Sequence, residues 1–460
     1  MLFNSLTFLL LHAVSLLLFW NISSQRVRLV LLLFSSFVFY GWFYWPGLLL
    51  LVGLIGVNYF LSWAINKYRL KWIFIVGICL NLLNLVWFKY AGFLFEIIES
   101  LFVFFNFEVV IPKPNYWLPL GISFYTFQFL GYFIDLYLGK VIHEKSILTF
   151  AVFKCYYAQL IAGPIVRANE LLPQLNNKTS FDLKRFQKGF FLLIGGLFVK
   201  ICVADILSQF VQFGFENAAT MEFLKAWLAL YGFAFQILSD FWGYSTMAVG
   251  IGLMYGINLP NNFNFPYMAT SFQDFWRRWH ITLSEWFRDY LYIPLGGSRG
   301  RNGIYFNLII TMTIAGIWHG AGWNFLFWGL GHGILLAIER RWNLHKKGGE
   351  QKWIKMIRQL IVFHSVCLLW VFFRAASFDE AVSFFNSLLL PPYNFSASHM
   401  ELLIITISLF LIFNRKLGRL FEGDNFTNLS LRKQLGITLT LFLFIIAYAD
   451  ATLDFIYFVF

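Results

Sequence analysis

Long apolar runs, separated by short clusters of charge, make up most of this chain. A run of roughly 17 to 25 apolar residues can cross a bilayer as a helix, and apolar runs lie near residues 3–20, 29–45, 48–66, 72–88, 117–138, 147–165, 186–210, 223–254, 304–319, 322–339, 357–373, 401–414 and 434–449. Several are too short or too interrupted to cross alone, so we expect about ten to twelve crossings plus re-entrant or interfacial helices. Backbone groups in lipid must be satisfied within their own segment, and the alternating pattern of a membrane barrel is absent. The sequence therefore predicts an all-α, polytopic membrane protein.

The composition supports this class. Of the 460 residues, 59% are hydrophobic and 13% are charged, and the mean hydropathy is +0.67. A soluble domain carries about 25% charged residues, so a soluble fold is excluded. The four cysteines are scattered without a CxxC pair, which predicts neither a disulfide framework nor a metal site. The first twenty residues have no basic leader and no small-residue cleavage site, so we interpret them as a retained first span.

The net charge of +12 is explained by topology, and nucleic-acid binding is not needed to account for it. Lysine and arginine concentrate in short cytoplasmic loops of membrane proteins. The basic clusters here are Arg26 with Arg28, residues 67–71, residues 277–301, residues 339–358 and residues 415–419. If all are cytoplasmic, the N-terminus, residues 374–398 and the C-terminus lie outside. No repeat, soluble domain or low-complexity linker is visible, so residues 1–460 are predicted to form a single membrane domain.

The densest polar stretch is "SFQDFWRRWHITLSEWFRDYLYIPLGGSRG", residues 271–300. A helix through it would place Trp276, Trp279 and Leu283 on one face and Arg278 and Thr282 on another. One interpretation is an amphipathic helix at the cytoplasmic interface, with tryptophans at headgroup depth. The other is a cytoplasmic mouth in which the arginines attract an anionic ligand. The "PLGGSRG" at the end of this stretch, which includes the glycines of "LGG", is typical of a turn.

His319 lies in the apolar segment 313–329, "TIAGIWHGAGWNFLFWG". Ionisable residues within spans are costly, and they usually face a bundle interior or a water-filled path. A neutral histidine bonded to a nearby carbonyl would also fit this position. Gly316, Gly320 and Gly322 favour function, because they leave room for a narrow substrate or a partner helix. His332 is better explained as a packed or interfacial residue.

Two motifs resemble the membrane-bound O-acyltransferase family, in particular its branch that O-acetylates alginate. They are "FWRRWHITLSEWFRDYLYIPLGG" and "GIWHGAGWNFLFWGLGHG", and further strings such as "LPLGISFYTFQFLGYFIDLYLGK" and "QLIAGPIVRANELLPQL" extend the resemblance over essentially the full chain. The family implies helices around a central tunnel, with a cytoplasmic acyl donor on one side, the acceptor on the other and an essential intramembrane histidine. By motif match that histidine is His319, with His280 as its partner nearer the cytoplasm.

The resemblance also suggests further site residues and a donor. Acetyl-CoA is the expected acyl donor, with no permanently bound cofactor, and Arg277, Arg278 and Arg288 are expected to attract its phosphates. Where the family has "DFSGYSDMA" this chain has "DFWGYSTMA". Asp240 is therefore retained as a candidate polar residue of the tunnel, whereas Thr246 replaces a second aspartate.

Acyl transfer to a hydroxyl needs a base beside that hydroxyl, and a neutral buried histidine can serve. No Gly-x-Ser-x-Gly elbow is present, and no cysteine sits beside a histidine or a basic cluster, so a serine or cysteine acyl-enzyme is not expected.

The last residues, 455–460, contain Phe455, Tyr457 and Phe460. This spacing resembles a C-terminal motif of the same branch, in which a tyrosine is thought to carry the acyl group to an exported transferase. We therefore consider Tyr457 a candidate acyl carrier and an exported esterase-like (SGNH-type) acetyltransferase a candidate outer partner. A plain interfacial anchor is the alternative for this tail.

These observations predict an O-acetyltransferase of the bacterial cytoplasmic (inner) membrane that serves an extracytoplasmic polysaccharide such as alginate. Cellulose, peptidoglycan and D-alanylated teichoic acid remain alternative polymers. A transporter that uses His319 as a proton relay is the non-enzymatic alternative, although the spans hold few other carboxylates and show no inverted repeat. A glycan polymerase would need a soluble catalytic domain or acidic metal-binding pairs, and neither is seen.

Overall fold

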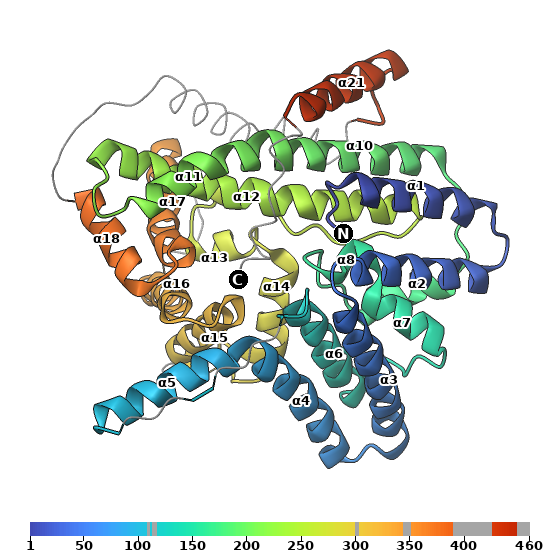
Figure 1. Ribbon diagram of the computed structural model, residues 1–460, viewed down its shortest axis with the longest axis horizontal. Coiled ribbons are helices and arrows are strands. Elements are labelled where there is room, and N and C mark those ends of the chain that lie inside the picture. Colours follow the sequence, from blue (N-terminus) through green and yellow to red (C-terminus); the bar gives the residue numbers. More distant parts are fainter. Residues whose placement is uncertain (108–110, 113–116, 300–302, 344–350, 390–425, 449–460) are drawn as a thin grey trace. The chain divides into compact units, whose positions relative to one another are not determined.

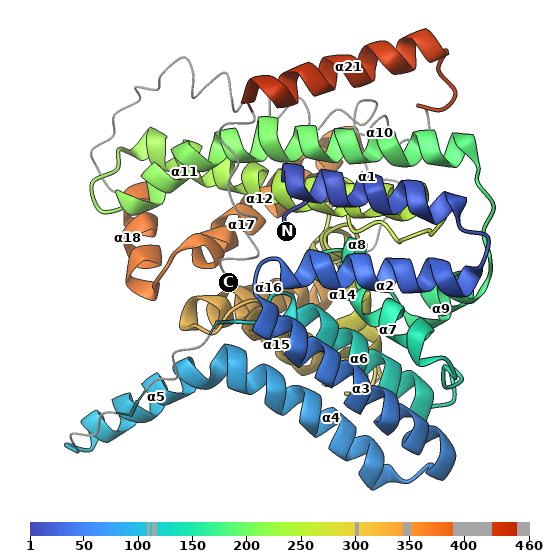
Figure 2. The same cartoon turned by 45° about the vertical axis from the view of Figure 1, so that its right-hand side comes forward.

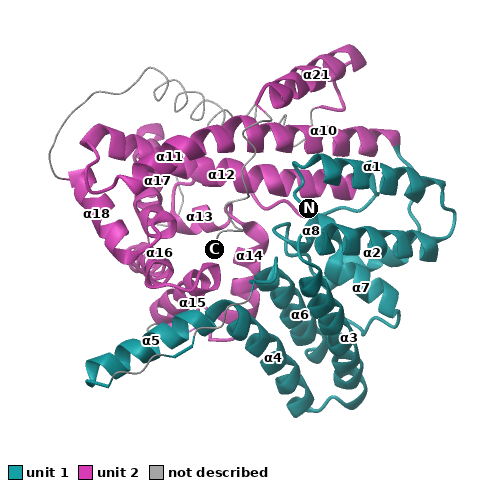
Figure 3. Cartoon of the chain, in the orientation of Figure 1, with its two compact units in different colours: residues 1–182, 254–259 teal, residues 183–253, 260–460 magenta. Residues whose placement is uncertain are grey.

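The computed structural model describes residues 1–107, 111–112, 117–299, 303–343, 351–389 and 426–448. Over these residues the regular structure is helical and no strand occurs (Figure 1), which confirms the predicted all-α class. They form two compact units (Figure 3): unit 1 is residues 1–182 with 254–259, and unit 2 is residues 183–253 with 260–460. That residues 1–460 form one membrane domain stays a prediction.

Unit 1 is built from the N-terminal helices. These are α1 (Leu6–Asn21), α2 (Gln25–Gly41), α3 (Trp45–Tyr68), α4 (Lys71–Leu85), the π-helix η1 (Val86–Tyr90), α5 (Ala91–Phe104), α6 (Ile122–Tyr137), α7 (Ile147–Cys155), α8 (Tyr157–Leu160) and α9 (Ala168–Asn176). Polar side chains inside this apolar unit pair with one another, as where Ser35 on α2 donates to Ser15 on α1 at 2.9 Å. Such pairing meets the requirement that buried polar groups be hydrogen-bonded.

Unit 2 holds the remaining helices. They are α10 (Leu183–Val199), η2 (Lys200–Asp205), α11 (Ile206–Glu216), α12 (Phe223–Met254), η3 (Pro266–Met268), α13 (Phe272–Trp276), α14 (Ile281–Phe287), η4 (Arg288–Tyr292), α15 (Gly303–His319), α16 (Trp323–Arg341), α17 (Lys352–Arg374), α18 (Phe378–Leu389) and α21 (Leu431–Tyr448). Helices α10 and α12 lie side by side in both views (Figures 1 and 2). Their backbones approach closely, since a Cβ on Gly196 would lie 2.6 Å from the carbonyl oxygen of Gly243.

The apolar runs of the sequence become helices of varied length. Five helical stretches among the described residues are long and apolar enough to cross a membrane, and α1 and α15 are shorter apolar helices. The run 223–254 forms α12 alone, whereas the run 147–165 breaks into α7, α8 and a loop. Residues 401–414 lie outside the described residues, and the number of crossings stays a prediction. The fold is that of a multi-pass membrane protein.

The segment 271–300 does not form the continuous helix that its predicted faces require. It breaks into α13, a turn, α14 and η4. The break lies at His280, which has a left-handed backbone with φ 41° and ψ 58° that an α-helix cannot contain. The expected turn at "LGG" is present, because Gly296 and Gly297 both have positive φ.

Candidate active site

A cavity of about 310 Å³ lies within unit 2, walled by α13, α14, η4, α15 and α16. Its apolar lining includes Trp276, Leu283, Phe287, Leu308 and Met312. Its polar lining comprises Gln273, Arg277, Ser284, Glu285, Arg288, Tyr292, Ser298, Thr311, His319, Glu339 and Arg340. One cavity therefore joins exposed arginines to a buried histidine, which are two of the groups that the sequence singled out.

Helices α15 and α16 form a hairpin whose contact is made by glycines. A Cβ on Gly316 would lie 2.3 Å from the carbonyl oxygen of Phe325, and one on Gly329 would lie 2.3 Å from that of Met312. A Cβ on Gly333 would likewise lie 2.7 Å from the Cα of Ile309. Of the two roles expected for the glycines near His319, Gly316 fulfils that of admitting a partner helix, as small residues do in membranes.

His319 is the last residue of α15 and is 4% exposed. Its ring lies edge-on to Trp328, with centroids 4.9 Å apart, and 5.3 Å from the ring of Phe373. Because aromatic rings surround it and one side faces the cavity, the imidazole sits at a boundary between a packed interior and a space that a ligand can enter.

The three predicted arginines are not equivalent. Arg277 and Arg288 line the cavity, whereas Arg278 does not. Arg278 is bound to Asp274 at 3.1 Å and donates to the carbonyl of Asn264 at 3.2 Å. Its part in the site is therefore structural.

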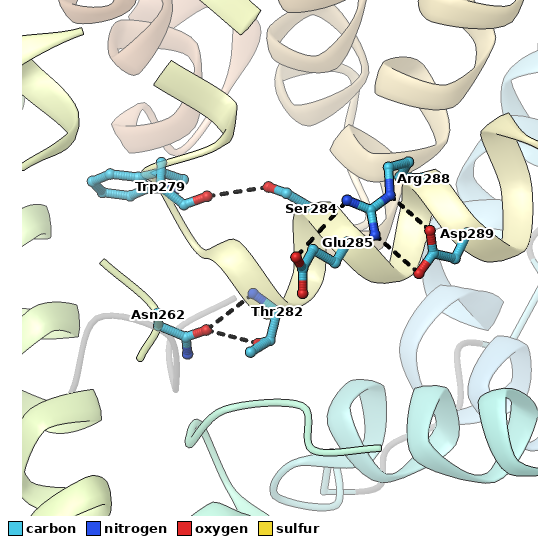
Figure 4. A network of polar contacts seen from close by, with 7 residues as sticks. All are labelled: Asn262, Trp279, Thr282, Ser284, Glu285, Arg288 and Asp289. Atoms are coloured by element: carbon cyan, nitrogen blue, oxygen red, sulfur yellow. Dashed lines mark hydrogen bonds and ion pairs between the residues drawn. The ribbon is translucent and has the colours of Figure 1, made fainter. Parts of the chain in front are cut away.

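Arg288 is held between two carboxylates (Figure 4). Its Nε lies 2.7 Å from Asp289 Oδ1, and its Nη1 lies 3.8 Å from Glu285 Oε1. The hydrogen bond that the guanidinium donates to Asp289 raises the pKa of Arg288. Arg277 is exposed and forms no ion pair with a described residue. Arg277 is thus better placed than Arg288 to receive an anionic ligand.

His280 is fully buried and lies outside the cavity lining. Its ring lies edge-on to Phe241 at 4.6 Å and 6.4 Å from the ring of Trp318, the neighbour of His319. Burial lowers the pKa of His280 to about 3, so the ring is neutral near pH 7. The two predicted histidines lie in the same part of unit 2, but only His319 faces the cavity.

Glu339 also lines the site, although the sequence indicated it only as part of the charged cluster 339–358 that predicts topology. It is 4% exposed and lines the cavity. Its carboxylate accepts hydrogen bonds from the backbone N–H groups of Phe272 and of Gln273, the latter at 3.1 Å. Glu339 thereby ties α16 to the start of α13, where an anion is favoured. An acidic residue at the end of an apolar run was the available signal.

Asp240 is not among the residues that line this cavity and belongs to a buried ion-pair cluster. Lys200 Nζ lies 2.7 Å from Asp240 and 2.7 Å from Asp205, with all three side chains at most 5% exposed. This arrangement links α12 to η2. The ion pairs give Asp240 a structural role, and its place in a tunnel stays a prediction. Tyr457 lies outside the described residues.

Comparison with known proteins shows which family the chain belongs to. The sequence profile of the membrane-bound O-acyltransferase family matches residues 140–347, which include the whole cavity lining. A peptidoglycan O-acetyltransferase of Helicobacter pylori is 38% identical over 387 residues, covering 76% of this chain and 72% of that protein. The chain belongs to the membrane-bound O-acyltransferase family.

Two further proteins are similar to this chain. The probable alginate O-acetylase of Pseudomonas aeruginosa is 37% identical over 390 residues, covering 83% of this chain and 73% of that protein. A teichoic acid D-alanyltransferase of Streptococcus thermophilus is 30% identical over 290 residues, covering 55% and 68%. The protein is therefore an O-acyltransferase that uses an acyl donor, as the sequence predicted.

Proposed function

We propose that the protein moves an acetyl group from acetyl-CoA across the bacterial cytoplasmic membrane for O-acetylation of an extracytoplasmic polysaccharide such as alginate. The observation that carries this proposal is the cavity that joins exposed Arg277 to buried His319. Acetyl is favoured over D-alanyl because the two acetyl-transferring relatives match at 38% and 37% identity, whereas the D-alanyl relative matches at 30% over fewer residues.

His319 acts as the general base. Its neutral imidazole takes the proton from an acceptor hydroxyl as the hydroxyl oxygen attacks the thioester carbonyl. A C–O bond forms, the C–S bond breaks, and the departing thiolate recovers the proton from the imidazolium. The aromatic rings around His319 keep bulk water away, which limits hydrolysis of the thioester.

Arg277 binds the phosphates of the donor at the exposed part of the cavity. A guanidinium suits phosphate because it offers several donors in one plane. Arg288 serves chiefly as an ion-paired wall residue with Glu285 and Asp289. His280 contacts the ring of Trp318, the neighbour of His319. We therefore assign His280 a role in positioning His319, without direct contact with the acetyl group.

Beyond the membrane, we propose that an exported esterase-like (SGNH-type) acetyltransferase receives the group. Tyr457 stays a candidate carrier for that step, since its phenol could hold the acetyl as an aryl ester. Tyr457→Phe removes only the oxygen. Loss of polymer acetylation in this variant, together with loss of acetyl-CoA consumption because the acceptor hydroxyl is gone, is the expected result, and wild-type acetylation would leave the tail as a membrane anchor.

The central experiment uses purified protein in liposomes with radiolabelled acetyl-CoA outside and, inside, a polysaccharide acceptor together with the exported acetyltransferase of the producing cells. Transfer of label to the acceptor supports the proposal, whereas proton flux without transfer would favour the transporter. Ester-linked acetate released by mild base from secreted alginate and from peptidoglycan of the producing cells then identifies the polymer.

A further inference from the structure

Helix α14, which supplies one wall of the cavity, begins without a cap of its own. The first N–H groups of a helix have no partner inside it, and the residue before the helix usually accepts one of them through a short polar side chain. That residue here is His280, whose side chain makes no capping hydrogen bond and whose φ is 41°. Helix α14 therefore starts at a strained residue that does not satisfy its end.

Asn262, which precedes His280 by 18 residues in the chain, caps the helix in its place. Its backbone oxygen accepts from Ile281 N at 2.9 Å, and its side-chain oxygen accepts from Thr282 N at 3.3 Å and Thr282 Oγ1 at 2.7 Å. Figure 4 shows the Asn262 side chain facing Thr282. The first two N–H groups of α14 are thus satisfied by one residue from another segment.

The cap is itself anchored to α12. The Asn262 amide donates to Ser245 Oγ at 3.0 Å, and Asn262 is 1% exposed. Phe241, one turn before Ser245 on α12, contacts the His280 ring at 4.6 Å. Helix α12 therefore contacts His280 directly through Phe241 and holds the two residues after His280 through the Asn262 cap.

We propose that Asn262 is a positioning residue for His280. As a remote N-cap, Asn262 stabilises the left-handed turn at His280, so the imidazole does not have to cap the helix. This inference rests on the proposed acyl transfer, in which His280 supports His319. A local cap such as serine in place of His280 would satisfy the helix but remove the imidazole. The remote cap permits both a stable helix start and a histidine at that position.

The activity test compares four proteins in liposomes: wild type, Asn262→Ala, His280→Ala and the double variant. Asn262→Ala is expected to lower kcat about tenfold or more and to add less than a further twofold loss when His280 is already alanine, because both act through one element. Losses that multiply, or a wild-type kcat in Asn262→Ala, would overturn the proposal. A wild-type protein that transfers no acetyl would instead refute the proposed function.

The matched control is Asn264→Ala. Asn264 is exposed and contacts Arg278 only through backbone atoms in the described structure, so its kcat is expected to stay at the wild-type value. Should Asn262→Ala not fold, Ser245→Ala and Thr282→Val remove the two side-chain contacts of Asn262 from the partner's side. Both are expected to lower kcat, and wild-type rates in both would overturn the proposal.

Hydrogen exchange followed by mass spectrometry tests the cap without any substrate. In Asn262→Ala, or in Thr282→Val if needed, the amides of residues 279–284 are expected to exchange several-fold faster, since two of them lose or weaken their acceptor. The amides of α15 are expected to be unchanged. Unaltered exchange at residues 279–284 would show that Asn262 does not hold this turn.

Discussion

Among the six histidines that the structure describes, His319 differs from the others in its surroundings. It combines near-complete burial, contact with Trp328 and Phe373, and a place in the cavity wall. His332 is as buried but packs among Phe275, Trp276 and Trp328 without lining the cavity. A general base must be able to contact the ligand and must also be shielded from bulk water. His319 meets both conditions.

His319→Ala is expected to abolish acetylation of the polymer while the protein level and the monodisperse elution profile stay as in wild type. Removing a general base costs roughly 10²- to 10⁴-fold. The measurement is ester-linked acetate on the secreted polymer together with label transfer in liposomes. His364→Ala, a partly exposed histidine on α17, is the matched control. More than a few per cent of wild-type activity in His319→Ala would exclude the assignment.

The two adjacent arginines provide a second test at the residue scale. Arg277→Ala is expected to raise the donor KM about tenfold, which corresponds to about 1.4 kcal/mol, and to reduce the salt dependence of donor capture. Arg278→Ala is expected to leave the donor KM nearly unchanged, because its guanidinium is already bound to Asp274. Initial rates at several salt concentrations measure both. Equal donor KM values for Arg277→Ala and wild type would reduce Arg277 to a topological anchor.

At the scale of elements, the hairpin of α15 and α16 depends on contacts that only glycine permits. Alanine usually improves a helix over glycine, but at Gly316 and Gly329 the added methyl would meet backbone 2.3 Å away. Backbone cannot move aside as a flexible side chain can. The two helices would have to separate, and His319 stands at the end of one of them.

Gly316→Ala and Gly329→Ala are each expected to destabilise the protein by about 1 to 3 kcal/mol, as overpacking does, and to lower its melting temperature in detergent by several degrees. Gly56→Ala on α3, where nothing lies within 4 Å of the added atom, is the control and should melt at the wild-type temperature or above. Thermal unfolding followed by tryptophan fluorescence gives the comparison. Unshifted melting of both hairpin variants would contradict the close helix contact.

The sequence predicted helices where apolar length alone decides the outcome, as in α12, but it did not predict the breaks within 271–300. The pattern of apolar and polar residues over 276–283 is compatible with a continuous helix. The turn at His280 is instead stabilised by Asn262 and Phe241, which come from distant segments. The same division between local pattern and tertiary contact holds for the candidate site. His319 and Arg277 could be found from local pattern and motif, whereas the ion pairs that occupy Arg278 and Asp240 depend on tertiary contacts.

At the scale of the whole molecule, the side of the membrane that each loop faces decides which donor the cavity can take. The positive clusters predict a cytoplasmic position for Ser24 and for the arginine-rich segment around Ser298, and an outer position for Phe43. Acetyl-CoA is a cytoplasmic metabolite, so Arg277 can receive it only if this segment faces inward. The topology and the donor are therefore one linked prediction.

Cysteine labelling tests that link. In a background with Cys79 and Cys202 replaced by alanine, which removes the two cysteines that are not buried, single cysteines replace Ser24, Phe43 or Ser298. All three positions are exposed. An impermeant maleimide added to spheroplasts is expected to label Phe43→Cys alone, and after permeabilisation to label Ser24→Cys and Ser298→Cys as well. Labelling of Ser298→Cys from outside would place the arginines where no acetyl-CoA is present, and the donor side of the proposed reaction would then have to be reassigned.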